Sequence, residues 1–529
     1  MMKGRFWSLG ARLPLAALLV FAGALAFAQT TLKIGLATEP ASLDPQFSTT
    51  GATQQASQQI FETIVARDRF LQPAPGLALS WKEVDPLTWE LKLRPNVKFH
   101  DGKAFGADDV VFSIKRIPGL ADSPSSYKRN VAVIKDAVAV DPLTVRLLLK
   151  SASPQLALDL SFIYVLPSTT PATATTEDFN KGLYVNGTGA FKFVEWVRGD
   201  RLVVERNAAY WGRKSSYDRV VFKPITNDPS RVAALLAGDV DMIDQVSPVD
   251  QERLRKDARV SLLSMPAATM MYIHMDSNRD VTPYVKAKDG SPLAKNPLKD
   301  PRVRKALSLS INRAALVERV LGGAAEPAGQ FVPEGMVGWA PELKPDPYDP
   351  EQAKKLLAEA GYPNGFAMTF FGPNDRYLND EQVTQTIGQF FARIGIDIKV
   401  QALPYSVFST AATNLEYSAF LMGFGNTTGD GARGMTAVLA TFDKASGNGA
   451  NNRGRYSNAD YDKFIGLAAQ ATDPAKRAGY LQDAIRVAMK DQAIIPLYFQ
   501  TTTWALRKGL AYETRMDEYT LANFVSSSK

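Results

Sequence analysis

The stretch PGLALSWKEVDPLTWELKLR occupies residues 75–94 and is followed by VKFHDG at 97–102 and ADDVVFS at 107–113. Within it, Trp89, Leu91 and Leu93 alternate with polar residues, which is the pattern of a strand with one buried face. An Asp-Pro pair at 85–86 predicts a turn before that strand. Short alternating segments bounded by turns recur between about residues 31 and 270, so we expect this half of the chain to be rich in strands.

From about residue 300 the pattern changes to helices that open on Asp-Pro pairs. Asp caps the first turn of a helix and Pro fits its first position, so the pairs at 300–301, 349–350 and 473–474 each predict a helix start. Apolar residues at 396–400 then alternate as a strand that follows a helical segment. We therefore expect an α/β second half and, at this length, two lobes.

The composition is that of an ordinary globular protein, with 45% hydrophobic residues and a formal net charge of +7 over 529 residues. Lys and Arg are scattered along the chain rather than gathered in a stripe, so we expect no nucleic-acid partner. The absence of cysteine excludes disulfides, thiolate catalysis, Cys-bound metals and a lipidated N-terminal Cys.

The N-terminus carries the pattern of a secretory signal peptide. Lys3, Arg5 and Arg12 precede an apolar run over 13–27 that ends in an A-x-A motif at Ala28. A membrane anchor is the alternative, but a bilayer-spanning helix needs roughly 20 apolar residues, which this run does not reach. We expect residues 1–28 to be removed by cleavage after Ala28, which leaves a periplasmic chain without a lipid anchor.

The sequence shows no constellation for catalysis. There is no G-x-S-x-G motif, and the two histidines, His100 and His274, do not form a close-spaced ligand pair. Residues 429–434 match G-x-G-x-x-G, but a polar loop precedes the motif and the nearest acid comes too early for a dinucleotide site. We expect no enzyme activity, no cofactor and no metal, and interpret the Gly/Asn-rich stretches 423–434 and 446–454 as loops.

The block at 75–113 resembles the family 5 extracellular solute-binding proteins, the dipeptide- and oligopeptide-binding components of bacterial ABC importers. GTGAFKF at 187–193, DPRVRKAL at 300–307 and IIPLY at 494–498 follow in the order of that family. The resemblance covers essentially the whole chain after the N-terminal segment.

The resemblance implies an α/β fold, a two-lobed periplasmic binding protein of the class II-like type with the ligand enclosed between the lobes. On this basis we expect lobe I to comprise residues 29–270 plus 500–529 and lobe II to comprise residues 271–499. The chain would cross a hinge near residues 270 and 499, and hinge closure would then signal the loaded state to an importer.

Two of the implied pocket positions depart from the peptide-binding relatives. Those relatives place an aspartate three residues after a tryptophan, near the end of a strand of the second lobe, and it pairs with the amino terminus of the peptide. In the matching frame 423–427, Phe424 stands in place of the tryptophan and Thr427 in place of the aspartate. The nearest acid is Asp430, which we expect to receive an ammonium if the ligand is a peptide.

The resemblance also suggests the other ligand contacts. Arg376 and Tyr377 match a position that meets the ligand's carboxylate and stacks on its backbone, and a solvated loop charge is the alternative for Arg376. Tyr405 matches a pocket tryptophan of dipeptide binders, and Arg433 is a second candidate for a carboxylate. The first-lobe rim that touches ligand in relatives matches Thr49, Thr50 and Gly51.

We therefore expect a periplasmic substrate-binding protein that captures a short peptide and delivers it, as a monomer, to the permease subunits of an ABC transporter in the inner membrane. The alternative within the same class is a non-peptide solute such as an opine, glutathione, a sugar or a metal chelate, and the presence of Thr427 favours it. A secreted enzyme and a chaperone-like interaction protein are further alternatives, for which the sequence shows no separate sign.

Overall fold

The computed structural model describes residues 1–2, 4, 30–120, 126–426 and 428–528. The predicted signal peptide therefore lies almost wholly outside the described residues. Within the described residues, no helix is both long enough and apolar enough to cross a lipid bilayer.

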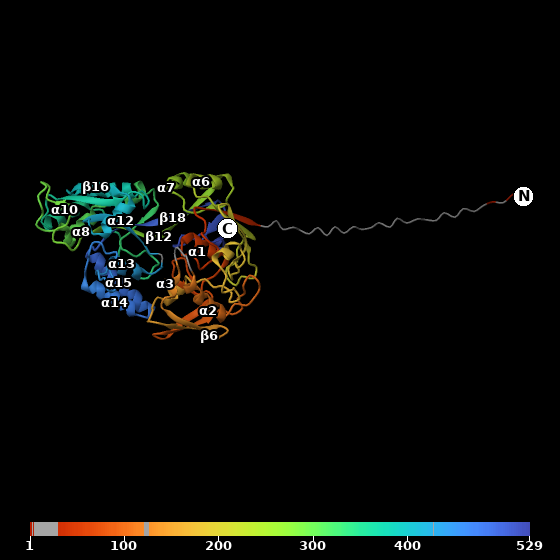
Figure 1. The fold of residues 1–529 in the computed structure, drawn as a ribbon. Helices are drawn as coiled ribbons and strands as arrows, with labels where there is room; N and C mark the ends of the chain where they lie inside the picture. The colour runs from red at the N-terminus through yellow and green to blue at the C-terminus, as the bar shows by residue number, and fades with distance from the viewer. Residues whose placement is uncertain (3, 5–29, 121–125, 427, 529) are drawn as a thin grey trace.

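A twelve-stranded mixed sheet runs through the whole molecule. Its strands follow one another in space in the order β13 (Val285–Lys286), β15 (Ala367–Pro373), β17 (Ala419–Gly425), β12 (Val260–Met275), β18 (Ile495–Arg507), β11 (Met242–Ile243), β1 (Thr31–Leu36), β10 (Arg219–Pro224), β9 (Arg201–Arg206) and β8 (Phe191–Val197), with β14 (Ala325–Pro327) on β18 and β16 (Asp397–Leu403) on β15. We use lobe I for the part from β1 to α7 (Pro248–Arg255) with the C-terminal segment, and lobe II for the part from β13 to the last helix (Figure 1).

The strands β12 and β18 connect the two lobes. They pair antiparallel over most of their lengths, and their ladder shifts register between Pro266, which faces Thr501, and Met270, which faces Phe499. Proline has no N–H to donate to a ladder, so an irregularity beside Pro266 has a local cause. Met270 and Phe499, near which we predicted the crossings, pair with each other at this irregularity.

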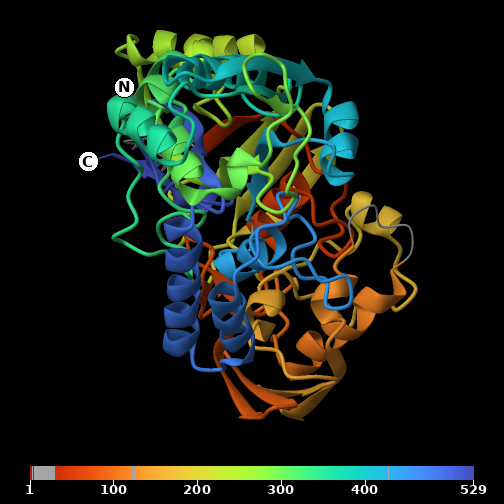
Figure 2. The ribbon, with the colours of Figure 1, turned by 90° about the vertical axis from the view of Figure 1, so that its left-hand side faces the viewer.

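The block at 75–113 builds a separate layer in lobe I. Its two strands, β4 (Ala78–Asp85) and β5 (Thr88–Leu93), join β7 (Thr144–Leu149) and β6 (Ile134–Asp141) in a four-stranded antiparallel sheet with the order β4, β5, β7, β6. Figure 2 shows this sheet (orange) at the far end of lobe I, beside the ends of two C-terminal helices (blue). The short pairs β2 (Ala66–Arg67) with β3 (Pro73–Ala74) and β19 (Leu510–Tyr512) with β20 (Val525–Ser527) complete the strands.

The helices cover both faces of the long sheet. Lobe I carries α1 (Gly51–Ile60), α2 (Ala107–Arg116), η1 (Ile117–Gly119), α3 (Lys128–Val131), α4 (Leu156–Leu160), α5 (Thr176–Asn180), α6 (Asp228–Ala237), α7 (Pro248–Arg255) and η3 (Ala522–Phe524). Lobe II carries η2 (Pro297–Lys299), α8 (Pro301–Leu309), α9 (Arg313–Arg319), α10 (Pro350–Glu359), α11 (Asp380–Arg393), α12 (Tyr405–Thr413), α13 (Gly431–Val438), α14 (Ala459–Gln470) and α15 (Pro474–Lys490).

The three predicted Asp-Pro helix starts are confirmed. The side chains of Asp300, Asp349 and Asp473 each accept a hydrogen bond from a backbone N–H of the first turn of α8, α10 and α15, and proline occupies the start of each helix. These starts were predictable because a cap is a local arrangement of a few neighbouring residues.

The prediction of a loop over 423–434 is wrong at both ends, because β17 continues to Gly425 and α13 begins at Gly431. Other parts of the chain occupy the space beside the glycines of the G-x-G-x-x-G motif, where a ligand would otherwise approach the backbone. A Cβ on Gly429 would lie 2.3 Å from the Leu71 carbonyl oxygen, and one on Gly434 would lie 2.6 Å from the Phe331 ring. The motif therefore allows close packing between segments of this chain.

Candidate ligand-binding site

Three parallel strands of lobe II end at the same edge of the sheet. β15 pairs parallel with β16 along its whole length and with β17 through Phe371 and Phe420. The carboxyl ends of parallel strands are where α/β proteins place ligands, because the loops that follow them converge there. The segments that leave these ends are 374–377, 404–405 and 426–430, which contain most of the site residues predicted for lobe II.

Arg376, Tyr377 and Tyr405 form one cluster at this edge. The Arg376 guanidinium lies 5.6 Å from the centroid of the Tyr377 ring and 5.4 Å from that of the Tyr405 ring. The two rings meet edge to face with their centroids 6.3 Å apart. Among the described residues the guanidinium has no hydrogen-bond or carboxylate partner, so its charge is held by aromatic faces and remains available to an anion.

Tyr377 is fixed against the strand β17. Its hydroxyl donates to the Gly423 carbonyl oxygen at 3.3 Å, and a Cβ on Gly423 would lie 2.7 Å from the Tyr377 ring. Burial raises the pKa of Tyr377 to about 12, with a smaller contribution from Tyr405 in the same direction, so the hydroxyl stays protonated as a donor. The close approach requires glycine at position 423.

The loop that holds Tyr405 carries an acid that the sequence analysis missed. Asp375 lies two residues after the end of β15, is exposed, and accepts the Tyr405 backbone N–H at 2.7 Å through Oδ1. Its other oxygen has no partner among the described residues. The sequence alone does not mark Asp375 as a site residue. Its contact with Tyr405 forms only when α12 packs beside the end of β15.

Phe424 and Asp430 take part in packing within lobe II. The Phe424 ring is half-buried, with its centroid 5.7 Å from that of Phe331. Asp430 is the N-cap of α13, where its Oδ1 accepts the Ala432 backbone N–H at 2.7 Å, and its Oδ2 is bound by Arg477 of α15. Asp430 and Arg477 are each 7% exposed. Both carboxylate oxygens of Asp430 are therefore already used within the protein, which weighs against an additional ammonium partner.

The remaining predicted residues lie on other elements. Thr50 is the N-cap of α1, and Gly51 begins that helix beside the Tyr519 ring, both in lobe I. Arg433 lies in the first turn of α13 with an exposed side chain. Thr427 lies outside the described residues. The structure thus groups Arg376, Tyr377 and Tyr405 directly, and the ligand roles of all these residues stay predictions.

The lobes touch next to this edge of the sheet. Gln72 of lobe I donates through Nε2 to the Gly429 carbonyl oxygen of lobe II. Beside this contact, both lobes line a cavity of about 330 Å³. Its walls include Trp81, Trp89, Gln155 and Leu158 from lobe I and Thr428, Asp430 and Arg477 from lobe II. Sequence reasoning missed Trp81, Trp89 and Arg477 as cavity residues, because only the folded chain brings these distant segments together.

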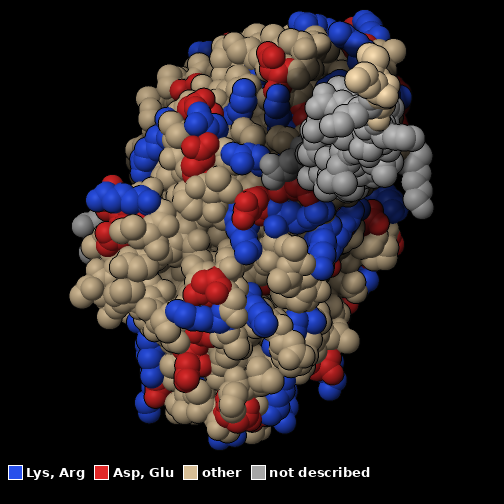
Figure 3. All heavy atoms as spheres, turned by 90° about the vertical axis from the view of Figure 1, so that its right-hand side faces the viewer, with Lys and Arg blue, Asp and Glu red and all other residues tan. Residues whose placement is uncertain are grey.

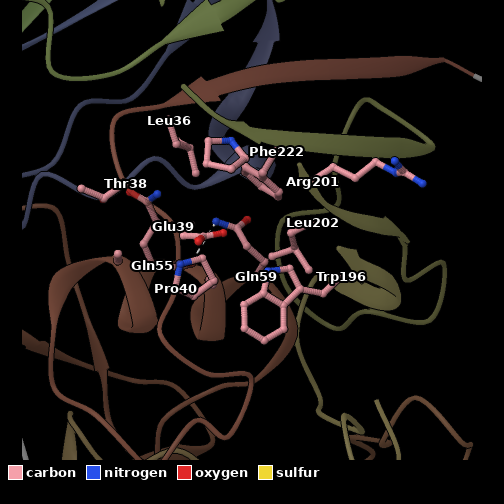
Figure 4. A pocket seen from close by; sticks show the side chains of 13 residues that line it. Leu36, Thr38, Glu39, Pro40, Gln55, Gln59, Trp196, Arg201, Leu202 and Phe222 are labelled. Carbon is pink, nitrogen blue, oxygen red and sulfur yellow. Dashed lines mark hydrogen bonds between the residues drawn. The ribbon is translucent and has the colours of Figure 1, made fainter. Parts of the chain in front are cut away.

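Two other cavities are less suited to a ligand of peptide size. One of about 250 Å³ lies at the hinge and is lined by Pro266, Phe499 and Trp339. The other lies within lobe I among Leu36, Gln59 and Trp196 (Figure 4) and measures about 20 Å³, which is room for about one water molecule.

The described residues contain no group of three or more His, Asp or Glu side chains placed to hold a metal ion. On the face seen in Figure 3, basic and acidic side chains are interspersed among uncharged ones. The chemistry that the site offers is therefore hydrogen bonding, charge pairing and aromatic stacking.

Comparison with known proteins agrees with this architecture. The glutathione-binding protein GsiB of Escherichia coli (strain K12) is 27% identical over 501 residues, which is 92% of each chain. The structure of HbpA2 from Haemophilus parasuis superposes with a TM-score of 0.81 at 25% identity, covering 94% of this chain and 100% of that one. The unliganded open form of the periplasmic murein tripeptide binding protein MppA gives the same TM-score at 23% identity, over 94% and 97% of the two chains.

The model of the family described as "Bacterial extracellular solute-binding proteins, family 5 Middle" matches residues 72–446, which is well over half of the chain. The predicted two-lobed α/β fold and the predicted family are confirmed. The chain belongs to the bacterial extracellular solute-binding proteins of family 5.

Proposed function

We propose that the protein captures a short peptide between its lobes in the periplasm and delivers it to the permease of an ABC importer in the inner membrane. The observation that carries this proposal is the cluster of Arg376, Tyr377 and Tyr405 at the carboxyl ends of three parallel strands. An unpaired guanidinium suits a ligand carboxylate, because its planar fork can bond both oxygens. The two rings offer stacking surface to a peptide backbone.

The relative in Escherichia coli supports a peptide ligand, because its name assigns it glutathione, a modified tripeptide that we grouped above with the non-peptide alternatives. The amino terminus of the peptide needs an acid, and Asp375 is better placed for it than Asp430. Asp375 is exposed with one free oxygen, whereas both oxygens of Asp430 are occupied. A ligand ammonium at Asp375 and a carboxylate at Arg376 would both lie beside the Tyr405 ring.

The division of the chain follows the two strands β12 and β18. We place the boundary at 270/271 and 499/500, with lobe I formed by residues 29–270 plus 500–529 and lobe II by residues 271–499. The support is the register irregularity between Pro266 and Met270, since a ladder that is interrupted there can bend without breaking further hydrogen bonds.

A monomer is sufficient for this design, because both walls of the cleft come from one chain. The protein acts by binding and release, without catalysis, after removal of residues 1–28.

The experiment is a thermal-shift panel on the chain that starts at Gln29. Free di-, tri- and tetrapeptides, their N-acetylated and amidated forms, glutathione, opines and sugars are each added at increasing concentration. A ligand that binds the folded state stabilises it by RT ln(1 + [L]/Kd), so its Tm rises with concentration. We expect free peptides to raise the Tm. A rise with opines or sugars and with no peptide would contradict peptide capture.

A further inference from the structure

The buried carboxylate of Asp380 binds the backbone of the segment that carries Arg376 and Tyr377. Asp380 is the first residue of α11 and is 3% exposed. Its Oδ2 accepts the backbone N–H of Arg376 and that of Tyr377, each at 2.9 Å. Its Oδ1 accepts the neighbouring Glu381 N–H at 3.0 Å. One buried acid therefore contacts the two consecutive residues whose side chains form most of the candidate cluster.

These contacts differ from those of an ordinary helix cap. A capping side chain accepts an N–H of the helix that follows it, as Asp349 does with the Gln352 N–H of α10. Asp380 instead accepts two N–H groups from the segment that precedes its helix. Asn379, which occupies the capping position of α11, makes no side-chain capping bond and donates to the Val320 carbonyl oxygen at 2.8 Å. Successive backbone N–H groups that converge on one anion form a defined anion-binding arrangement, so Asp380 fixes the preceding segment.

The segment 375–377 is held at both ends by other bonds. The Asp375 side chain binds the Tyr405 backbone, and the Tyr377 hydroxyl donates to a carbonyl oxygen of β17. The Arg376 side chain between them is exposed and lies over the two tyrosine rings. The direction of its guanidinium therefore depends on the backbone at residue 376, which Asp380 binds.

We propose that Asp380 is a positioning residue for ligand recognition, which holds the Arg376 backbone so that the guanidinium can bond both oxygens of a ligand carboxylate. The inference rests on the proposed function, in which Arg376 meets that carboxylate. A two-bond pair between guanidinium and carboxylate requires a defined relative orientation, so a rotated backbone would lose one of the bonds. Asp380 is buried and acts through residues 376 and 377 without touching the ligand itself. It should therefore determine the selectivity for a free carboxylate.

The test is calorimetric titration of the chain that starts at Gln29 with pairs of peptides that differ only in a free or an amidated C-terminus. We expect the wild-type protein to bind the free member roughly ten- to a hundredfold more tightly, which is the range for charged hydrogen bonds. Asp380→Ala should lose most of this ratio, through weaker binding of the free peptide. Asp380→Asn should keep most of it, because an amide oxygen can accept the same two N–H groups.

Glu381→Ala is the matched control. Glu381 is the neighbouring acid in the first turn of α11, and its carboxylate accepts the Gln385 side-chain amide within that helix at 3.2 Å. The change removes the same charge from the same helix start but leaves the bonds to the 376–377 backbone in place. The ratio should keep its wild-type value. A ratio that falls as far as in Asp380→Ala would assign the effect to negative charge at the helix start and overturn the positioning role.

A purely structural role of Asp380 predicts a different pattern. Lower stability of lobe II would weaken free and amidated peptides by the same factor, so an Asp380→Ala variant that keeps the wild-type ratio would overturn the inference. If that variant does not fold, Asp380→Ser supplies the test, because serine suits a helix start but its shorter side chain cannot reach both N–H groups. If the wild-type protein binds no peptide, or binds free and amidated peptides equally, it is the proposed function that fails, whatever the variants show.

Discussion

Asp430 at the start of α13 and Arg477 on α15 form an ion pair that is almost fully buried. The pair joins the loop after β17, which adjoins the candidate site, to the helix α15. The position where the sequence analysis expected a free acid for the ligand is therefore part of the internal structure of lobe II.

Replacing Asp430 with Asn should destabilise the protein in the absence of ligand. The change leaves Arg477 buried without its counter-charge, which costs about 3–5 kcal/mol of unfolding free energy. Urea unfolding of the ligand-free protein measures this loss. Asp483→Asn is the control, because Asp483 pairs with Arg486 on the same helix at an exposed position and its loss should cost at most about 1 kcal/mol. Unchanged stability together with lost affinity for free, but not acetylated, peptides would instead make Asp430 a ligand residue.

Gly423→Ala should weaken ligand binding through Tyr377. The added methyl group would lie 2.7 Å from both the Tyr377 ring and the Met271 sulfur, so the ring must move away from its place in the cluster. We expect a roughly tenfold or greater loss of peptide affinity, in line with the cost of disturbing an aromatic contact in a binding site. Gly466→Ala, in the open interior of α14, is the control and should be neutral or stabilising by up to about 1 kcal/mol. Normal affinity in Gly423→Ala would show that the Tyr377 ring does not contact the ligand.

Arg376→Gln should abolish the preference for a free C-terminal carboxylate. The wild-type protein is expected to bind a free peptide roughly ten- to a hundredfold more tightly than its C-terminal amide, because the guanidinium can bond both carboxylate oxygens. In the variant the two affinities should become nearly equal, and the Tm without ligand should stay the same, since the Arg376 side chain is exposed. Titration calorimetry of each peptide pair gives the ratio. A variant that still prefers the free carboxylate would assign this contact to another residue.

The buried His274 should make the protein sensitive to acid. Burial lowers its pKa from 6.5 to about 3, and the charges of Arg453 and Arg455 add to the effect. The folded chain therefore keeps the imidazole neutral while the unfolded chain protonates it below pH 6.5. The stabilising contribution is complete above pH 6.5 and is lost at about 1.4 kcal/mol per pH unit as the pH falls toward 3.

His274→Phe isolates this contribution, because the ring lies among aromatic neighbours such as Tyr272 and Phe420 and because His100 titrates equally in both proteins. Unfolding free energies at pH 7.5, 5.5 and 4.5 should fall more steeply in the wild-type protein than in the variant. Parallel curves would mean that His274 titrates normally in the folded state.

The sequence predicted those features that depend on neighbouring residues or on the whole pattern of the chain. The caps at Asp300, Asp349 and Asp473 are local, and the order of motifs from residue 75 to residue 498 indicated the family. The loop prediction over 423–434 failed because glycines were interpreted as a sign of a loop, whereas Gly423, Gly429 and Gly434 allow close packing against residues that are distant in the sequence.

The residues of the candidate site likewise include some that the sequence predicted and some that it did not. The resemblance predicted Arg376, Tyr377 and Tyr405. They meet in the structure because the strands that precede them end at the same edge of the sheet. Asp375 was not predicted. The role proposed for it depends on the Tyr405 backbone, which folding brings close. A single sequence without aligned relatives holds no signal for such contacts.

Native mass spectrometry of the protein, purified without denaturation from cells that produce it, tests peptide capture most directly. We expect one chain with one bound molecule, which denaturation releases and fragmentation identifies as a short peptide with a free carboxylate. A released sugar, opine or metal chelate, with no peptide in any preparation, would contradict it.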